Sequence, residues 1–144
     1  MIVDARELLS RDVTPELYRE IRELWKSHSI AEDKRDIAGL IATLTPDCVY
    51  EVVGGAGARW EGHAGATRFY MELLGAIPDI HFDLQQIVIG PQGVCEEATV
   101  TGTQKGKWLS RAATGSAVEF RVVIFFPWDP RLKKFKGERV FLWS

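Results

Sequence analysis

The sequence has few of the residues that signal a disulfide scaffold, a membrane span or a nucleic-acid interface. Only two of its 144 residues are cysteines, Cys48 and Cys95, and both lie in apolar runs without metal-type spacing. We interpret them as reduced, buried side chains. No apolar run reaches the roughly 18 residues that cross a bilayer. Because the formal net charge is −2, no excess of positive charge favours binding to nucleic acid.

What is present is the composition of an ordinary globular protein. Hydrophobic residues make up 46% of the chain and charged residues 26%, so a single domain over residues 1–144 can bury a core without disulfides. The sequence has no internal repeat and no low-complexity linker. Residues Met1–Glu7 carry charge too early for a secretory signal. We therefore predict one cytoplasmic domain.

Hydrophobic periodicity predicts three helices in the first half of the chain. The first begins at Thr14-Pro15, a capping hydroxyl followed by proline at the first helical position. Its apolar face has helical spacing and consists of Leu17, Ile21, Leu24, Trp25 and His28. A shorter helix ends before Pro46, and its apolar face consists of Ile37, Leu40, Ile41 and Leu44. The third helix is predicted from about His63 to Ala76.

After Pro78 the hydrophobic period changes from 3.6 to 2, which predicts strands. The expected strands are an early one over 48–53, a hairpin of 80–89 and 94–104, a strand over 118–126 and a closing strand within 135–144. Helices followed by hairpin-linked strands indicate an α+β fold. We expect a curved antiparallel sheet wrapped around the three helices, with a cavity between the layers.

The closing residues Gly137-Glu138-Arg139-Val140 resemble the last strand of the SnoaL-like polyketide cyclase group of the NTF2-like proteins. Short motifs in the same order extend the likeness over nearly the whole chain, namely Trp25, Asp47 with Tyr50, Trp60-Glu61-Gly62, Pro78-Asp79, Gly102-Thr103 and Thr114-Gly115. The resemblance implies an NTF2-like cone that holds a small, largely apolar, oxygenated molecule without a metal or nucleotide cofactor. Relatives of this group cyclise polyketide intermediates with a pocket carboxylate, whose pKa rises in apolar surroundings.

The chain departs from the family where catalytic residues are expected. Trp143 stands at the family's terminal acid, and Glu138 is the remaining acid of the closing strand, expected near the mouth of the cone. Against the related cone of limonene epoxide hydrolase, Tyr50 matches a water-holding tyrosine but Val52 replaces an asparagine. The charged positions of that enzyme fall at Ala98, Val100 and Val140 here. Whether the chain catalyses a reaction is therefore left open.

The catalytic residues are also left open, with Tyr50, His63 and Glu97 as candidates. Strand parity does not decide whether Tyr50 faces the cavity, and His63 is expected at the rim, at the start of the third helix. Glu96 and Glu97 are adjacent, so one of them points inward in a regular strand. The inward carboxylate needs a partner such as Arg121 or has a raised pKa. A structural Glu–Arg pair across strands explains the same residues.

Aromatic side chains are expected to form much of the ligand pocket, because they bury a large area at little rotamer cost. The predicted ligand-binding residues are Trp25, Tyr50, Trp60, His63, Trp108 and Val140. His28 is expected to be a satisfied core or rim histidine. Asp79, His81 and Asp83 share one strand face, and without a further partner they predict a solvated surface rather than a metal site.

Three functions remain open from the sequence. The first is a SnoaL-like enzyme that cyclises or isomerises its substrate by acid–base catalysis. The second is a non-catalytic protein that binds a small hydrophobic molecule, which the missing closing-strand acid favours. The third is an interaction module, because Phe125 and Phe141 are expected on the outer sheet face and predict a homodimer through it.

Overall fold

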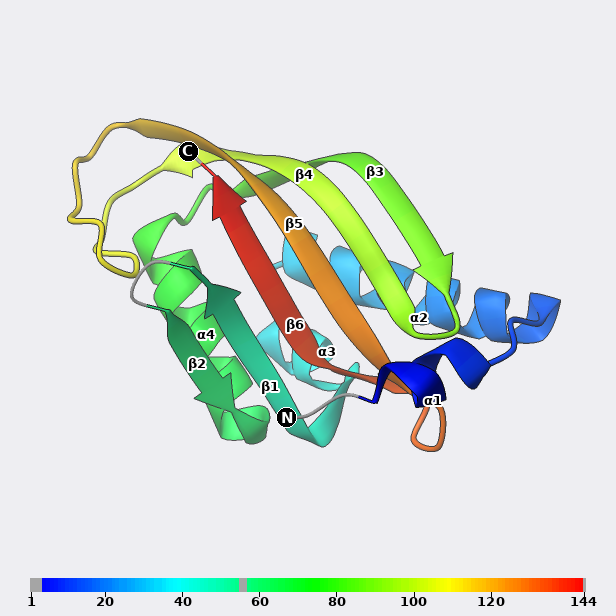
Figure 1. The fold of residues 1–144 in the computed structure, drawn as a ribbon. Coiled ribbons are helices and arrows are strands. Elements are labelled where there is room, and N and C mark those ends of the chain that lie inside the picture. The colour runs from blue at the N-terminus through cyan, green and yellow to red at the C-terminus, as the bar shows by residue number, and fades with distance from the viewer. Residues whose placement is uncertain (1–3, 55–56, 144) are drawn as a thin grey trace.

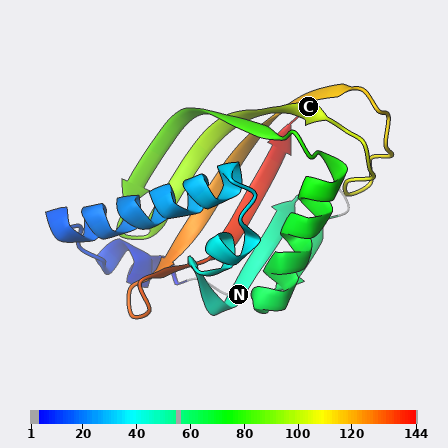
Figure 2. The same ribbon diagram turned by 180° about the vertical axis from the view of Figure 1, so that it is seen from behind.

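A strongly curved six-stranded sheet forms one layer of the molecule, and the described helices other than the N-terminal one lie against its concave side (Figures 1 and 2). The computed structural model describes residues 4–54 and 57–143. The strand order is β2-β1-β6-β5-β4-β3. The helices are α1 (Ala5–Ser10), α2 (Pro15–Asp33), α3 (Ile37–Ile41) and α4 (Gly62–Ala76). The strands are β1 (Leu44–Val53), β2 (Ala58–Glu61), β3 (His81–Gly90), β4 (Gly93–Thr103), β5 (Ala117–Asp129) and β6 (Lys134–Trp143).

The two long helices form where the sequence predicts them. Thr14 caps α2 by accepting a hydrogen bond from the Leu17 N–H at 3.1 Å, and Pro15 occupies its first turn. The helix buries Ile21 and His28 against the sheet. In α4 the apolar side includes Phe69, Tyr70 and Leu73, all buried. Amphipathic spacing therefore places one helix against each half of the concave face (Figure 2).

The short elements differ from the sequence prediction. The second predicted helix is shorter, since α3 ends at Ile41 and Leu44 already belongs to β1. Pro46 lies inside β1, in a stretch where the pairing with β6 is irregular, as expected for a residue without an N–H group. Neither α1 nor β2 is predicted. The first buries no residue and the second buries only Trp60, so neither carries a periodic apolar signal.

The sheet is antiparallel at every described strand pair except one. Strands β1 and β6 run parallel, with Tyr50 beside Glu138 and Val52 beside Val140. The sequence predicted an antiparallel sheet and did not pair these two strands, so their parallel direction corrects that expectation. Most of the chain separates β1 from β6, so no tight turn sets their relative direction.

The outer sheet face carries cross-strand ion pairs and an aromatic pair. Glu97 lies 3.7 Å from Arg121, and the rings of Phe125 and Phe141 meet edge to face at 6.4 Å between centroids. Phe125 is 44% exposed, which agrees with its expected outward direction. Self-association through this face stays a prediction.

Other expectations concern the cysteines and the chain ends. Cys48 is buried and Cys95 half-buried, and both are free thiols. None of the described helices is long and apolar enough to cross a membrane. Residues 1–3, part of the segment in which no signal peptide was expected, lie outside the described residues, as does residue 144 of the closing strand.

Gly137 permits the close approach of β6 to β1. Its φ of +114° is a conformation that side chains rarely adopt, and a Cβ placed there would collide with the Val49 carbonyl oxygen. The next residue along the strand is Glu138, which the register places beside Tyr50. The glycine of the closing motif therefore fixes the position of the acid that follows it.

Replacing this glycine tests that role. Gly137→Ala is expected to lower the free energy of unfolding by at least about 1–3 kcal/mol, because it combines an unfavourable φ with a backbone collision. Gly75→Ala in α4 is the matched control: its added Cβ meets nothing within 4 Å, and alanine favours a helix. Urea unfolding measures both, and equal stability of the two variants would contradict the packing argument.

Candidate functional site

A chain of hydrogen bonds between buried side chains joins four elements on the concave side. His28 comes from α2, Tyr70 from α4, Tyr50 from β1 and Glu138 from β6. Each is at most 4% exposed. Burying a polar group costs free energy unless the group is hydrogen-bonded. We therefore expect each of these side chains to have a partner.

The contacts converge on one carboxylate oxygen. The Tyr70 hydroxyl donates to Glu138 Oε2 at 2.9 Å, and His28 Nε2 lies 3.0 Å from the same oxygen. The hydroxyls of Tyr50 and Tyr70 are 2.6 Å apart. Because the single proton of Tyr70 goes to Glu138, Tyr50 must donate to Tyr70. The two tyrosines thus form a directed chain that ends on the carboxylate.

The hydrogen bonds of Thr43 fix the tautomer of His28. The Thr43 hydroxyl donates to the Leu40 carbonyl at 2.7 Å, so its oxygen is free to accept from His28 Nδ1 at 2.8 Å. Nδ1 therefore carries a hydrogen. On its other side, Nε2 lies 3.0 Å from Glu138 Oε2 and 3.1 Å from the Tyr70 hydroxyl. We call this pair of buried side chains the His28–Glu138 dyad.

The dyad forms part of the floor of a small cavity, here called the inner pocket, of about 90 Å³. Its buried or half-buried lining consists of Trp25, His28, Ser29, Glu32, Phe82, Glu96, Ile124, Phe126 and Glu138. Its exposed lining consists of Asp33, His81 and Leu84. The pocket therefore opens to solvent between α2 and β3. Apolar walls surround several ionisable groups at its base.

Two further carboxyl groups in the inner pocket resist ionisation. Burial, with a smaller contribution from the charge of Glu138, raises the pKa of Glu96 to about 8, while a hydrogen bond from Trp25 opposes the shift. Burial and the neighbouring carboxylates also raise the pKa of Glu32 well above its ordinary value. At neutral pH Glu96 is therefore mostly a neutral carboxylic acid, able to donate a hydrogen bond.

The three candidate catalytic residues lie in different places. Tyr50 faces inward and belongs to the hydrogen-bonded chain. His63 is exposed at the start of α4, where its Nε2 lies 3.1 Å from the Leu44 carbonyl oxygen. Glu97 does not reach the interior, because it points to the outer face and pairs with Arg121. The inward neighbour is Glu96, so the raised pKa and the Glu–Arg pair are both present, on adjacent residues.

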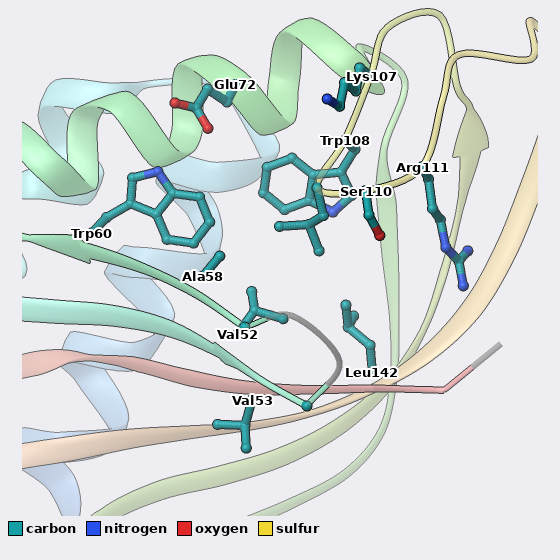
Figure 3. Close-up of a pocket in the computed structure, with 13 residues that line it drawn as sticks. Val52, Val53, Ala58, Trp60, Glu72, Lys107, Trp108, Ser110, Arg111 and Leu142 are labelled. Atoms are coloured by element: carbon teal, nitrogen blue, oxygen red, sulfur yellow. The ribbon is translucent and has the colours of Figure 1, made fainter.

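The predicted ligand wall is divided between two cavities. Trp25 lines the inner pocket, whereas Trp60 and Trp108 line a larger cavity of about 840 Å³, here called the Trp cleft (Figure 3). The two tryptophan rings there are nearly parallel, with centroids 6.1 Å apart. Tyr50 and Val140 line neither cavity and are buried. The single pocket expected from sequence is split because aromatic side chains fill its centre.

Phe69 is the main separating side chain. Its ring lies 4.8 Å from Tyr50, 5.0 Å from Trp60 and 5.6 Å from Trp108, measured between centroids. One aromatic layer therefore stands between the hydrogen-bonded chain and the Trp cleft.

Glu138 lies beneath the inner pocket rather than near the mouth of the cone, which corrects the sequence expectation for its depth.

The polar residues at and just before the start of β3 make different contacts. Asp79 accepts hydrogen bonds from the Thr103 N–H and hydroxyl at 2.7 and 2.9 Å, so it fixes the end of β4. His81 is exposed and contributes to the lining of the inner pocket. No three described His, Cys, Asp or Glu side chains are arranged to hold a metal ion.

His28 and Tyr70 are functional candidates that the sequence did not single out, since His28 was expected to be a satisfied core or rim histidine. Both occupy apolar positions of amphipathic helices, and that position alone indicates packing. The signal that could have found them is the presence of a polar or ionisable side chain at an inward position of each of four elements, α2, α4, β1 and β6. Because His28 and Glu138 are 110 residues apart, the pairing becomes visible only in the folded chain.

Comparisons with known proteins agree with this architecture. A family model described as the SnoaL-like domain matches residues 25–129. A protein assigned as a SnoaL-like polyketide cyclase from Jannaschia sp. CCS1 superposes with a TM-score of 0.72 at 20% identity, covering 92% of this chain and 91% of that chain. An LEH-like epoxide hydrolase from M. tuberculosis gives a TM-score of 0.67 at 20% identity, covering 89% and 85%.

An NTF2-like protein from Burkholderia pseudomallei K96243 gives a TM-score of 0.70 at 15% identity, covering 84% of this chain and 88% of that chain. No curated protein matches the chain. At such low identity these structures establish the shared fold, and they carry no residue assignments to this chain.

The raised pKa of Glu96 makes stability depend on pH. Between its ordinary value of 4.5 and about 8, the unfolded chain loses this proton while the folded protein keeps it, so rising pH favours unfolding. Glu96→Gln removes this effect. Relative to the wild type, the variant is expected to gain up to about 1.4 kcal/mol per pH unit across that window, levelling off above it.

Chemical unfolding at several pH values between about 5 and 8.5 measures this gain. Glu97→Gln is the matched control, since its side chain is 40% exposed on the outer face. A difference between Glu96→Gln and wild type that stays constant with pH would contradict the buried, neutral state of Glu96.

Proposed function

The chain belongs to the SnoaL-like family, and we propose that it performs general acid–base chemistry on a small, largely apolar, oxygenated molecule in the inner pocket. The observation that carries the proposal is the His28–Glu138 dyad at the base of a pocket that also holds Glu96. A neutral acid and a proton-accepting pair at one site are the two components that proton transfer next to a carbonyl group requires.

Each group has a distinct role in the proposed step. Glu96, neutral at pH 7, donates a hydrogen bond to the carbonyl oxygen of the substrate. Glu138, as the carboxylate of the dyad, removes a proton from the adjacent carbon, and the C–H electron pair forms the enolate. The hydrogen bond from Glu96 stabilises the negative charge that develops on oxygen. Return of the proton to a different carbon completes an isomerisation, and attack of the enolate carbon on a second carbonyl gives a cyclisation.

The rest of the dyad's surroundings prepare Glu138 for this role. His28 is held in one tautomer by Thr43, and Tyr70 donates to the same carboxylate oxygen at 2.9 Å. The contacts of Glu138 with Tyr70 and with His28 both use Oε2, so the second carboxylate oxygen, Oε1, takes no part in them. His28 can supply or hold a proton while Glu138 exchanges one with the substrate. Tyr70 holds the carboxylate in place through its hydrogen bond, and Tyr50 holds Tyr70.

The inner pocket suits the reacting end of an apolar molecule. Trp25, Phe82 and Phe126 provide apolar contact, and the opening between α2 and β3 leaves room for the remainder of the substrate outside. The volume of about 90 Å³ admits a small ring or a short carbonyl-bearing segment. Polyketide-like cyclic ketones and enones have these properties.

The same pocket is compatible with binding without catalysis, in which the acids only orient a ligand. This second function is favoured by the absence of an acid at the end of β6, where Trp143 stands. The two functions differ in one measurable property: an enzyme exchanges substrate protons with solvent, whereas a carrier binds the same molecule unchanged.

Deuterium exchange into a small cyclic enone tests the proposal without knowledge of the natural substrate. We expect the protein to accelerate exchange of the acidic C–H protons of cyclohexenone in D₂O, followed by proton NMR. Glu138→Gln should lower the rate by about 100-fold or more, the usual contribution of a general base. The rate should also fall as pH rises through about 8, because Glu96 then loses its proton.

Glu97→Gln is the control and should leave the exchange rate unchanged. In Glu96→Gln the amide still donates a hydrogen bond, so a slower reaction without the decline near pH 8 is expected. Binding of the enone without exchange would overturn the catalytic proposal in favour of a carrier. Neither binding nor exchange with a panel of cyclic enones and ketones would overturn both functions.

A further inference from the structure

The Trp cleft is separate from the inner pocket and differs from it in charge. Val52 and Leu142 provide apolar side chains in the cleft, with Trp60 from β2 and Trp108 from the segment between β4 and β5 (Figure 3). Each tryptophan is only 6% exposed, so their rings are held by packing. At about 840 Å³ the cleft has the size of a site for a whole small molecule.

Two cationic side chains at the cleft have no ion-pair partner among the described residues. Lys107 and Arg111 belong to the segment between β4 and β5, and neither side chain forms a salt bridge or hydrogen bond there. Glu72 is the acidic residue at the cleft, and Arg68 lies 3.5 Å from its carboxylate. Figure 3 shows Lys107 and Arg111 on the Trp108 side and Glu72 toward the Trp60 side.

The backbone holds the cationic segment in a defined position. Trp108 and Arg111 exchange backbone hydrogen bonds of 3.0 and 2.9 Å, and the buried Gln104 side chain donates to the Arg111 carbonyl at 3.0 Å. The N–H groups of Lys105 and Gly106 both donate to the Ala76 carbonyl at the end of α4. The position of Arg111 beside an apolar cavity is thus a built feature of the fold.

We propose that the Trp cleft binds a flat aromatic carboxylate. The apolar body would lie against the tryptophans and the aliphatic side chains, where burial of nonpolar area drives binding. The carboxylate would meet Arg111, whose planar guanidinium can form two parallel hydrogen bonds with it, with Lys107 adding positive charge. The Ser110 hydroxyl lies on the same side (Figure 3) and offers a further donor.

This site is independent of the proposed acid–base chemistry. The cleft shares no lining residue with the inner pocket, and the packed Phe69 ring stands between them. The described lining of the inner pocket contains acidic side chains and no lysine or arginine, whereas Lys107 and Arg111 beside the cleft attract an anion. The two cavities therefore select molecules of different charge.

A comparison of 2-naphthoate with its neutral amide, 2-naphthamide, tests the inference. Titration calorimetry measures affinity, and the indole N–H signals of Trp60 and Trp108 report where the probe binds. We expect naphthoate to bind about tenfold more tightly than the amide at low salt, to lose that advantage in Arg111→Gln, and to weaken as salt increases. Arg131→Gln, at the exposed turn between β5 and β6, should leave the affinity unchanged.

Glu138→Gln keeps this test separate from the proposed function, since Glu138 lines the inner pocket and not the cleft. Its thermal midpoint is measured first, so that only folded protein is titrated. Unchanged naphthoate binding in that variant supports the cleft site, whatever the outcome of the exchange experiment. Equal affinity for acid and amide, an unaffected Arg111→Gln protein, loss of binding in Glu138→Gln, or no binding at all would each overturn the inference. Because the Arg111 side chain makes no hydrogen bond with the part of the chain that the structure describes, its removal should leave the thermal midpoint unchanged.

Discussion

The contact between His28 and Glu138 connects the first long helix to the last strand, and the interior is organised around it. A buried charged pair is costly to create, and removing one partner from such a pair costs about 3–5 kcal/mol because the other is left unpaired. Tyr70 and Thr43 complete the hydrogen bonding of the pair, and Tyr50 extends it to β1. The helices and the sheet are therefore held in register by polar bonds as well as by apolar packing.

The position of the acid along β6 explains how the chain combines a SnoaL-like fold with an altered interior. Val140, Leu142 and Trp143 occupy the end of the closing strand, so carboxylate chemistry cannot arise there. Glu138 lies earlier in the strand, and Gly137 lets it sit beside β1. As a result the ionisable groups gather between α2 and the sheet, while the opposite end of the interior is apolar with cationic side chains at its edge.

Amphipathic spacing predicted most of the fold, since α2, α4 and the hairpin of β3 and β4 follow from local periodicity. The site was less accessible to such reasoning. Glu96 and Glu97 were known to face opposite ways, but the sequence does not contain the strand register that decides which one is buried. The parallel pairing of β1 with β6 joins residues nearly ninety positions apart, so local patterns could not place Tyr50 beside Glu138.

His28 shows the same limit in another form. A histidine on the apolar face of a helix is usually a packed core residue, and only the approach of Thr43 and Glu138 gives it a fixed tautomer and a proton to share. Leu44 illustrates the opposite error, because it continues the helical spacing of α3 and yet begins a strand. In both cases a long-range contact outweighs the local pattern.

The most direct test of the His28–Glu138 dyad is the ¹⁵N NMR spectrum of the His28 side chain in wild type and in Glu138→Gln. The hydrogen bonds predict that Nδ1 carries a hydrogen, and that the Nε2 signal shifts strongly when Glu138 is replaced while Nδ1 changes little. A histidine with a bare Nδ1, or an Nε2 signal insensitive to the loss of Glu138, would contradict the dyad on which the proposed chemistry depends.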